Sequence, residues 1–358
     1  MEDIVEAEHP SEGPQLTQNP RKPPLVRRAF RNRFGHLRAG WRLLLYALVA
    51  FAVGKSISTV LKLFMANPSE APFASWAHSV LWVIGTCGLI GGALILLRFF
   101  DRRPCELLGL GFSAGWLREI GGGLAAGVGS TGLLAAILVV AGSVSIGFSP
   151  DPAASLAAMP RYLFIFLMAA AVEELVFRGY PLQVLAEGSR RWIAGLLLCT
   201  LFTMGHGNNP DVTAVGFLNI FLASVLLTVL YFQTRRLWLP IALHFSWNFA
   251  QSWLWGYDVS GIKIENQLFV MRPNGSELVN GGEFGLEGSI LSTILFAAVI
   301  AWFLARPILR PTAEVAAVWA PYPAGFGVDP MSFVPSEKVQ ESGEAEGKRG
   351  KGAEGAAS

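Results

Sequence analysis

Two carboxylates and one guanidinium lie inside a single apolar run of the sequence, at Glu173, Glu174 and Arg178. The run extends from Leu163 to Leu185 and is long enough to cross a bilayer, which takes about 20 helical residues. Each charged group at the centre of a spanning helix costs about 2.5–3.5 kcal/mol on insertion scales. We therefore expect these three groups to face a protein interior and to find partners there.

The spacing of the three groups separates their roles. In a helix, Glu174 and Arg178 stand four residues apart on one face, an arrangement that favours an ion pair. Glu173 points about 140° away from Arg178, because each residue turns a helix by about 100°. The interpretation is that Glu174 and Arg178 neutralise each other and leave Glu173 available for chemistry. The alternative is a purely structural Glu–Arg pair that joins two helices, although such a pair needs only one carboxylate.

Two of the five histidines also belong to apolar segments. His206 ends the motif Phe202-x-x-x-His206, and His244 precedes Asn248 by four residues, so that His244 and Asn248 share one helical face. A lone histidine in a membrane more often makes a hydrogen bond between helices than it catalyses a reaction. Two histidines, an asparagine and a spare carboxylate on separate segments instead indicate one shared polar cavity.

Such a cavity could hydrolyse an acyl bond. A carboxylate beside a histidine, as Glu173 would be, can hold a water molecule and take its proton as a general base. His244 and Asn248 can donate hydrogen bonds to an oxyanion, where the loss of one donor costs about 2.7–4 kcal/mol of barrier. We recognise no Gly-x-Ser-x-Gly elbow, no His-Glu-x-x-His motif and no Walker loop. The expected nucleophile is therefore water rather than serine or cysteine.

The same residues leave a metal-dependent mechanism open. Glu173, His206 and His244 match the ligand set of a catalytic zinc site that uses two histidines and one glutamate. These ligands would come from three different apolar segments, and the sequence contains no compact metal-binding motif. Spacing along the chain does not fix the distances between them, so zinc stays a candidate cofactor at this point.

The composition indicates which elements must position these residues. The chain has 358 residues, of which 52% are hydrophobic and only 15% are charged, against about 25% charged in a soluble domain. The cysteines Cys87, Cys105 and Cys199 have no metal-site spacing and are expected to be unpaired packing residues. We therefore predict an all-α protein, a polytopic helical bundle in a membrane.

Eight apolar segments predict about eight transmembrane helices. They span residues 41–65, 76–99, 120–142, 161–185, 192–206, 212–233, 237–256 and 286–305. Arginines mark every second connection, and the alternate connections are poor in Lys and Arg, so the positive-inside rule places both chain termini in the cytoplasm. We assign 1–38 to a disordered basic leader, 39–310 to the transmembrane domain and 311–358 to a disordered tail.

At the polar motifs the chain resembles the CPBP intramembrane proteases, a family named for CAAX proteases and bacteriocin-processing enzymes. The three family motifs are matched in order by Glu173-Glu174-x-x-x-Arg178, Phe202-x-x-x-His206 and His244-x-x-x-Asn248. Each match lies in a separate apolar segment. The resemblance covers about residues 160–250, the protease-like core of the predicted transmembrane domain.

The resemblance implies an intramembrane endopeptidase that cuts a membrane-associated or prenylated, CAAX-type protein or peptide. Glu173 and His206 would activate water, and His244 and Asn248 would stabilise the oxyanion. The remaining motif residues would support the site: Glu174, Arg178 and Phe202. Family members have been described both as metalloproteases and as metal-independent glutamate proteases, and we favour the second. The expected partners are a peptide or protein substrate and membrane lipid, not nucleic acid, and the expected location is the plasma membrane of a bacterium.

Two other functions and one geometric difficulty accompany this hypothesis. A non-catalytic membrane scaffold or bacteriocin-immunity protein would keep the same polar cluster for binding. A transporter would also carry charges in its membrane segments, but the sequence lacks internal repeats. In addition, Glu173 falls near the middle of its predicted segment and His206 near the end of a short one. For the two to meet, the segment of His206 must tilt, start late or be displaced in depth.

Overall fold

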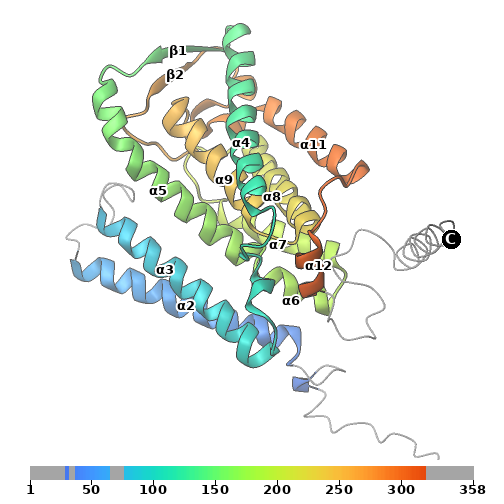
Figure 1. The fold of residues 1–358 in the computed structure, drawn as a ribbon. Helices are drawn as coiled ribbons and strands as arrows, with labels where there is room; N and C mark the ends of the chain where they lie inside the picture. The colour runs from blue at the N-terminus through green and yellow to red at the C-terminus, as the bar shows by residue number, and fades with distance from the viewer. Residues whose placement is uncertain (1–28, 32–36, 65–75, 320–358) are drawn as a thin grey trace, which may run out of the picture.

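The computed structural model describes residues 29–31, 37–64 and 76–319, which form a helical bundle with a two-stranded sheet at one end (Figure 1). The helices are α2 (Ala39–Phe64), α3 (Trp76–Ile95), α4 (Trp116–Val140), α5 (Pro152–Phe177), α6 (Tyr180–Gly188), α7 (Arg191–Gly205), α8 (Ala214–Thr234), α9 (Trp238–Phe249), α10 (Glu277–Asn280), α11 (Ile290–Ala305) and α12 (Ala313–Trp319). Helices α2 and α3 form a pair beside α5, and α9 packs against α4, α5 and α8. The predicted all-α class is confirmed.

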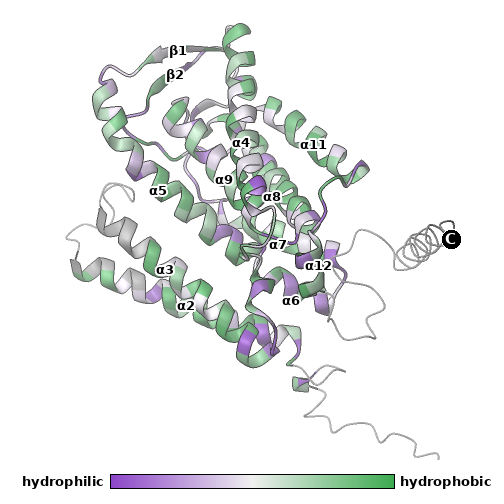
Figure 2. Ribbon diagram, in the orientation of Figure 1, coloured by the Kyte–Doolittle hydropathy of each residue, from purple (hydrophilic) through white to green (hydrophobic). Residues whose placement is uncertain are grey.

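The described helices follow the apolar segments closely, with one exception. Among the described residues, four stretches are long and apolar enough to cross a membrane, namely Val83–Asp101, Trp116–Val140, Pro152–Glu187 and Ala214–Thr234. Helices α7 and α11 are apolar but shorter. Most residues along the helices are hydrophobic (Figure 2). The total of eight transmembrane helices stays a prediction.

The exception is the fourth segment, predicted at 161–185, because the structure divides this region between two helices. Helix α5 starts at Pro152, where the side chain of Asp151 accepts a hydrogen bond from the Ala154 N–H and caps the helix. It ends at Phe177, and Pro181 lies in the first turn of α6, where a missing N–H costs nothing. Glu173 is therefore one turn from the end of α5.

Buried ion pairs join the N-terminal helix pair to α6. Arg42 of α2 is 1% exposed, lies 2.8 Å from Asp101 at the end of α3, and also pairs with Glu187 of α6. Arg103 pairs with the same Glu187. The single buried carboxylate of Glu187 thus pairs with two arginines.

A second basic connection lies at the same end of the bundle, near the start of α4. Between α8 and α9, Arg236 donates to Glu119 through Nε at 2.9 Å, and the Leu237 N–H donates to the Gly109 carbonyl at 2.9 Å. Hydrophilic residues gather around α6 and α12 at this end (Figure 2). The connections that contain Arg103 and Arg236 therefore lie at one end of the bundle.

The opposite end carries a feature that the hydropathy pattern did not predict. Strand β1 (Val144–Phe148) pairs antiparallel with β2 (Phe269–Pro273), with Ile146 opposite Met271. Strand β2 belongs to the long connection between α9 and α11. The sheet therefore ties that connection to the end of α4.

Helices α4 and α9 approach each other closely at two glycines. A Cβ atom added to Gly127 would lie 2.0 Å from the Ser246 hydroxyl, and one added to Gly123 would lie 2.8 Å from the backbone nitrogen of Leu243. The Ser246 hydroxyl donates to the Gly123 carbonyl at 3.1 Å. Small residues here allow the two helices to approach closely, and the contact fixes the position of α9.

The two assigned tails lie mostly outside the described residues. Within the segment 311–358, however, Ala313–Trp319 forms helix α12, in which Val315 is buried. The Glu314 carboxylate accepts a hydrogen bond from the Ala114 N–H at 3.0 Å. The ordered part of the chain therefore extends beyond residue 310.

Candidate active site

The end of α5 gives its two adjacent carboxylates different surroundings. Glu174 is fully buried, and its Oε1 lies 2.9 Å from Nη1 of Arg178, which is the predicted ion pair. Arg178 also donates to the Ser224 carbonyl of α8 at 3.1 Å. Glu173 keeps 29% of its side chain exposed and forms no such pair among the described residues. The spare carboxylate is thus the one that remains accessible.

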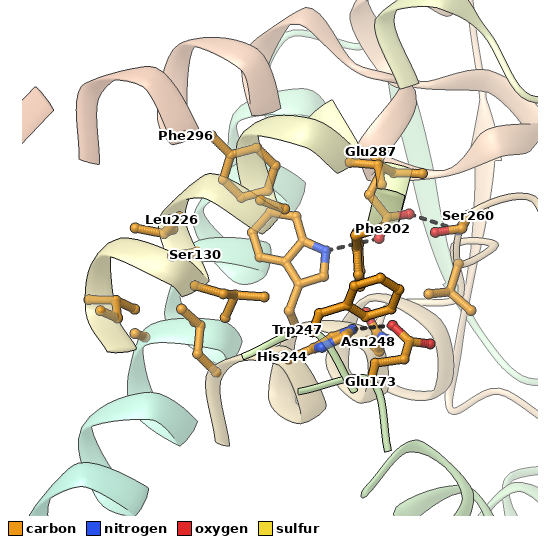
Figure 3. A pocket seen from close by; sticks show the side chains of 18 of the residues that line it. Ser130, Glu173, Phe202, Leu226, His244, Trp247, Asn248, Ser260, Glu287 and Phe296 are labelled. Atoms are coloured by element: carbon orange, nitrogen blue, oxygen red, sulfur yellow. Dashed lines mark hydrogen bonds and ion pairs between the residues drawn. The ribbon is translucent and has the colours of Figure 1, made fainter. Parts of the chain in front are cut away.

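Glu174 has a second partner that the sequence did not reveal. Nδ1 of His244 lies 2.9 Å from the same Oε1 of Glu174. An ionised carboxylate only accepts hydrogen bonds, so Nδ1 of His244 carries a proton and donates it. This bond turns Nε2 of His244 towards Glu173, whose Oε2 lies 3.7 Å away (Figure 3).

His206 reaches the same carboxylate from α7. This helix has 15 residues, about 22 Å of rise, and His206 follows its last residue directly. Nε2 of His206 lies 4.0 Å from Oε2 of Glu173. The predicted difficulty of depth disappears, because α5 starts earlier than expected and Glu173 lies near its end.

The ring of His206 has a defined orientation. Its Nδ1 lies 2.8 Å from the Phe202 carbonyl, which can only accept, so Nδ1 donates and Nε2 of the neutral ring is left with a lone pair. The Phe202 ring lies 4.6 Å from the His206 ring and 4.7 Å from the guanidinium carbon of Arg178. Phe202 therefore packs between the cation and the histidine that flank the two carboxylates.

All four residues expected to do the chemistry line one cavity of about 680 Å³. They are Glu173, His206, His244 and Asn248, and Figure 3 shows three of them together with Phe202. Oε2 of Glu173 is buried and has no hydrogen-bond partner among the described residues. A polar atom in that state, facing two imidazoles, is suited to bind a water molecule.

The rest of the cavity wall is mainly apolar. Helix α8 contributes Leu226 and Leu230, and α11 contributes Phe296 and Phe303. Helices α4 and α11 lie outside the three matched motifs but still line the cavity. An apolar wall beside a polar catalytic group is the usual composition of a ligand-binding pocket.

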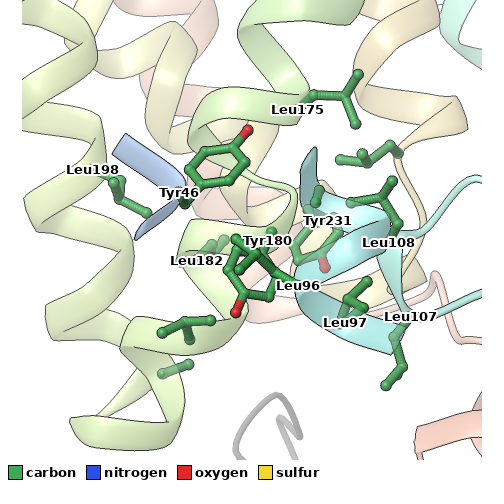
Figure 4. Packing of buried hydrophobic residues seen from close by; sticks show 14 of the residues in the cluster. Tyr46, Leu96, Leu97, Leu107, Leu108, Leu175, Tyr180, Leu182, Leu198 and Tyr231 are labelled. Carbon is green, nitrogen blue, oxygen red and sulfur yellow. The ribbon is translucent and has the colours of Figure 1, made fainter. Parts of the chain in front are cut away.

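Packed side chains hold the break between α5 and α6 in place. Leu175 on one side of the break and Tyr180 and Leu182 on the other are buried in one cluster (Figure 4). Their neighbours include Leu107 and Leu108 from the connection after α3. This cluster fixes the end of α5 and, with it, the direction of the two carboxylates.

The proposed zinc ligands are not arranged as a metal site. Zinc needs its ligand atoms about 2.0–2.2 Å from one point. The part of the chain that the structure describes contains no group of three His, Cys, Asp or Glu side chains that could hold a metal ion. In Glu173, His206 and His244 the structure shows instead two imidazoles that face one carboxylate oxygen.

The expectation that no Gly-x-Ser-x-Gly sequence is present is wrong, because Gly111-Phe112-Ser113-Ala114-Gly115 has these letters. It occupies the turn before α4 and not a strand-to-helix elbow. The Ser113 hydroxyl accepts a hydrogen bond from Arg236 Nη1 at 3.0 Å and does not line the cavity. Ser113 is therefore part of the arginine-rich end and not a nucleophile of this site.

One buried carboxylate in the cavity was missed. Glu287 is 6% exposed and lines the same cavity, although it lies outside all three motifs. The sequence could have indicated this residue, because Glu287 is the second residue of the predicted segment 286–305. An ionisable group in an apolar segment is a candidate functional residue.

The comparisons with known proteins agree with the motifs. Residues 155–250 match the family model described as type II CAAX prenyl endopeptidase Rce1-like. No curated protein and no solved structure matches the chain. The matched segment contains Glu173, His206 and His244. Residues 155–250 are therefore similar to the Rce1-like domain, and this match supports the resemblance to the CPBP intramembrane proteases.

Proposed function

We propose that this protein is an intramembrane endopeptidase that hydrolyses a peptide bond of a membrane-associated or prenylated, CAAX-type substrate with water activated by Glu173. The Rce1-like family implies a CAAX-type endopeptidase in general, and the apolar helices agree with a membrane protein. The observation that carries the proposal is the position of Glu173 Oε2, 4.0 Å from Nε2 of His206 and 3.7 Å from Nε2 of His244.

The two histidines suit different tasks because their Nδ1 atoms have different partners. His206 donates through Nδ1 to a backbone carbonyl, so its Nε2 can accept a hydrogen bond from a water molecule held by Glu173. His244 donates through Nδ1 to Glu174, so its Nε2 can donate only when the ring is an imidazolium. The carboxylates of Glu173 and Glu174 stabilise that positive charge.

The reaction follows from these assignments. Glu173 takes one proton from water while the water oxygen attacks the scissile carbonyl carbon. The resulting oxyanion accepts hydrogen bonds from His244 Nε2 and the Asn248 amide. When the tetrahedral intermediate collapses, the carbon–nitrogen bond breaks and Glu173 gives its proton to the leaving amine. Glu174 and Arg178 hold His244 and do not exchange protons with the substrate.

The apolar wall of the cavity supports a lipid-linked or hydrophobic substrate. Leu226 and Leu230 of α8 and Phe303 of α11 line this wall. Burial of apolar surface stabilises binding by about 25 cal/mol per Å². A prenyl or hydrophobic peptide segment would therefore gain affinity from this wall.

The proposal is tested by reconstitution of the full chain in liposomes with a prenylated CAAX peptide and with the same peptide unprenylated. Glu173→Ala is expected to abolish cleavage, and the control Glu265→Gln, at an exposed position outside the cavity, is expected to cleave as wild type. Equal turnover by wild type and Glu173→Ala would rule the mechanism out.

A further inference from the structure

A second carboxylate, that of Glu287, lies in the wall of the same cavity. Glu287 comes from the short turn Leu286–Gly288 before α11, beyond the residues that match the family. Its side chain is almost fully buried, at 6% exposed. Among the described residues it nevertheless forms no ion pair with lysine or arginine. Burial of an isolated carboxylate is costly, so its hydrogen bonds must stabilise it.

Three neutral donors converge on the two oxygens of Glu287. Oε2 accepts from the Ser260 N–H at 2.7 Å and from Gln251 Nε2 at 2.9 Å. Oε1 accepts from the indole Nε1 of Trp247 at 3.3 Å (Figure 3). The Glu287 carboxylate therefore joins separate parts of the chain through three hydrogen bonds.

Two of these donors belong to the helix that carries the proposed oxyanion donors. Trp247 lies directly before Asn248 in α9, and Gln251 follows in the π-helical continuation Ala250–Leu254. Both bonds fix the rotation of α9 about its axis. Asn248 and His244 depend on that rotation, because they must point into the cavity.

The third donor leads to His206. The Ser260 carbonyl accepts from Asn209 Nδ2 at 3.1 Å, and the Asn209 N–H donates to the His206 carbonyl at 3.1 Å. One residue, Ser260, thus links Glu287 to the turn that follows His206. The link has little freedom, since a Cβ atom on Gly261 would lie 1.9 Å from the Pro210 carbonyl oxygen.

The backbone of Glu287 is itself anchored. Its carbonyl accepts from Asn219 Nδ2 of α8 at 2.7 Å. Asn219 is fully buried and also donates to the Ser289 carbonyl at 2.8 Å. The backbone of Glu287 is therefore held in place independently of its side-chain partners. Its carboxylate can for this reason determine where those partners lie.

We propose that Glu287 is a positioning residue of the peptidase site, which holds the helix of His244 and Asn248 and the turn of His206 in a fixed mutual arrangement through its three hydrogen bonds. The inference rests on the proposed function. It gives a role to a residue from outside the Rce1-like segment, and the polar cluster is then complete only when the turn before α11 is in place.

The experiment compares Glu287→Ala, Glu287→Gln and the control Glu283→Gln in the liposome cleavage assay. Glu283 is 57% exposed and pairs with Lys263 outside the cavity, so its variant is expected to match wild type. Glu287→Ala is expected to lower kcat about 10–100-fold with KM unchanged, as for the loss of outer partners that orient catalytic groups. The kcat of Glu287→Gln is expected to lie between those of wild type and Glu287→Ala, because glutamine keeps one acceptor oxygen for Ser260 and Gln251.

Two further measurements separate positioning from loss of fold. The thermal unfolding midpoint of Glu287→Gln in detergent is expected to equal that of wild type while its kcat is lower. The indole N–H resonance of Trp247, assigned by its loss in Trp247→Phe, is expected to shift in Glu287→Gln and not in Glu283→Gln. A wild-type kcat in both Glu287 variants would overturn the positioning role. A kcat that falls only in proportion to the fraction of unfolded protein would overturn it as well. A wild-type protein that cleaves no substrate would instead overturn the proposed function.

Discussion

Nδ1 of His244 and Oε1 of Glu174 lie 2.9 Å apart, inside a cluster in which Glu174 also pairs with Arg178. One fully buried carboxylate therefore neutralises a cation and orients a histidine. Its neighbour Glu173 faces the cavity. The two adjacent acids should consequently respond to substitution in opposite ways.

Replacement of Glu174 is expected to affect stability, whereas replacement of Glu173 is expected to affect only catalysis. Glu174→Ala leaves the guanidinium of Arg178 buried without a carboxylate, which costs about 3–5 kcal/mol of unfolding free energy. Glu173→Ala removes a group that is 29% exposed and carries no such pair, so the unfolding free energy should stay near wild type. Denaturant titration in detergent micelles measures both. Equal stability of the two variants would contradict the division of roles.

A milder change at Glu174 tests the orientation of His244. Glu174→Gln keeps the shape but removes the negative charge that stabilises an imidazolium at His244. We expect kcat to fall about 10–100-fold, as for other losses of an orienting partner, with little change in KM. Steady-state cleavage of a prenylated peptide measures both constants. A rise in KM at constant kcat would place Glu174 in substrate binding instead.

Two glycines of α4 offer a matched pair for the contact with α9. Gly127→Ala places a methyl group 2.0 Å from the Ser246 hydroxyl, and such overpacking costs about 1–3 kcal/mol. Gly129→Ala meets nothing within 4 Å and should stabilise the helix by about 0.5–1 kcal/mol. Thermal unfolding compares the two variants. If both changed stability equally, the close approach at Gly127 would not limit the packing of the helices.

Chelation tests the metal-independent mechanism. The described residues contain no group arranged to hold a metal ion, and the chemistry assigned to Glu173 and His206 needs none. Cleavage is therefore expected to survive dialysis against EDTA and 1,10-phenanthroline. Loss of activity that added zinc restores would favour the alternative, with Glu173, His206 and His244 as ligands after rearrangement.

The shared arginine-rich end of the bundle leads to a prediction of topology. Arg42, Arg103 and Arg236 all lie at that end, and the positive-inside rule places it in the cytoplasm. Reporter fusions at the two chain termini should both give the cytoplasmic signal, and a fusion in the connection that contains β2 should give the opposite one. Termini on opposite sides would show an odd number of spans.

Much of the fold could be predicted because apolar runs report directly on helices. In a membrane every backbone polar group needs an internal partner, so a long apolar run forms a helix regardless of its neighbours. The boundary at Gly179 was missed, although Pro181 indicates it, because hydropathy does not register a break between two apolar helices. The strands β1 and β2 were missed, because their pairing depends on residues far apart in the chain.

Sequence alone determined the residue types and the division between the acids: helical spacing pairs Glu174 with Arg178 and leaves Glu173 free. Only the tertiary structure decided that Glu174 also binds His244, that His206 reaches Glu173, and that Glu287 joins the cavity from outside the motifs. The physical reason is the range of the interactions. Pairing within one helix depends on neighbours a turn apart, whereas these contacts depend on how separate helices end and pack.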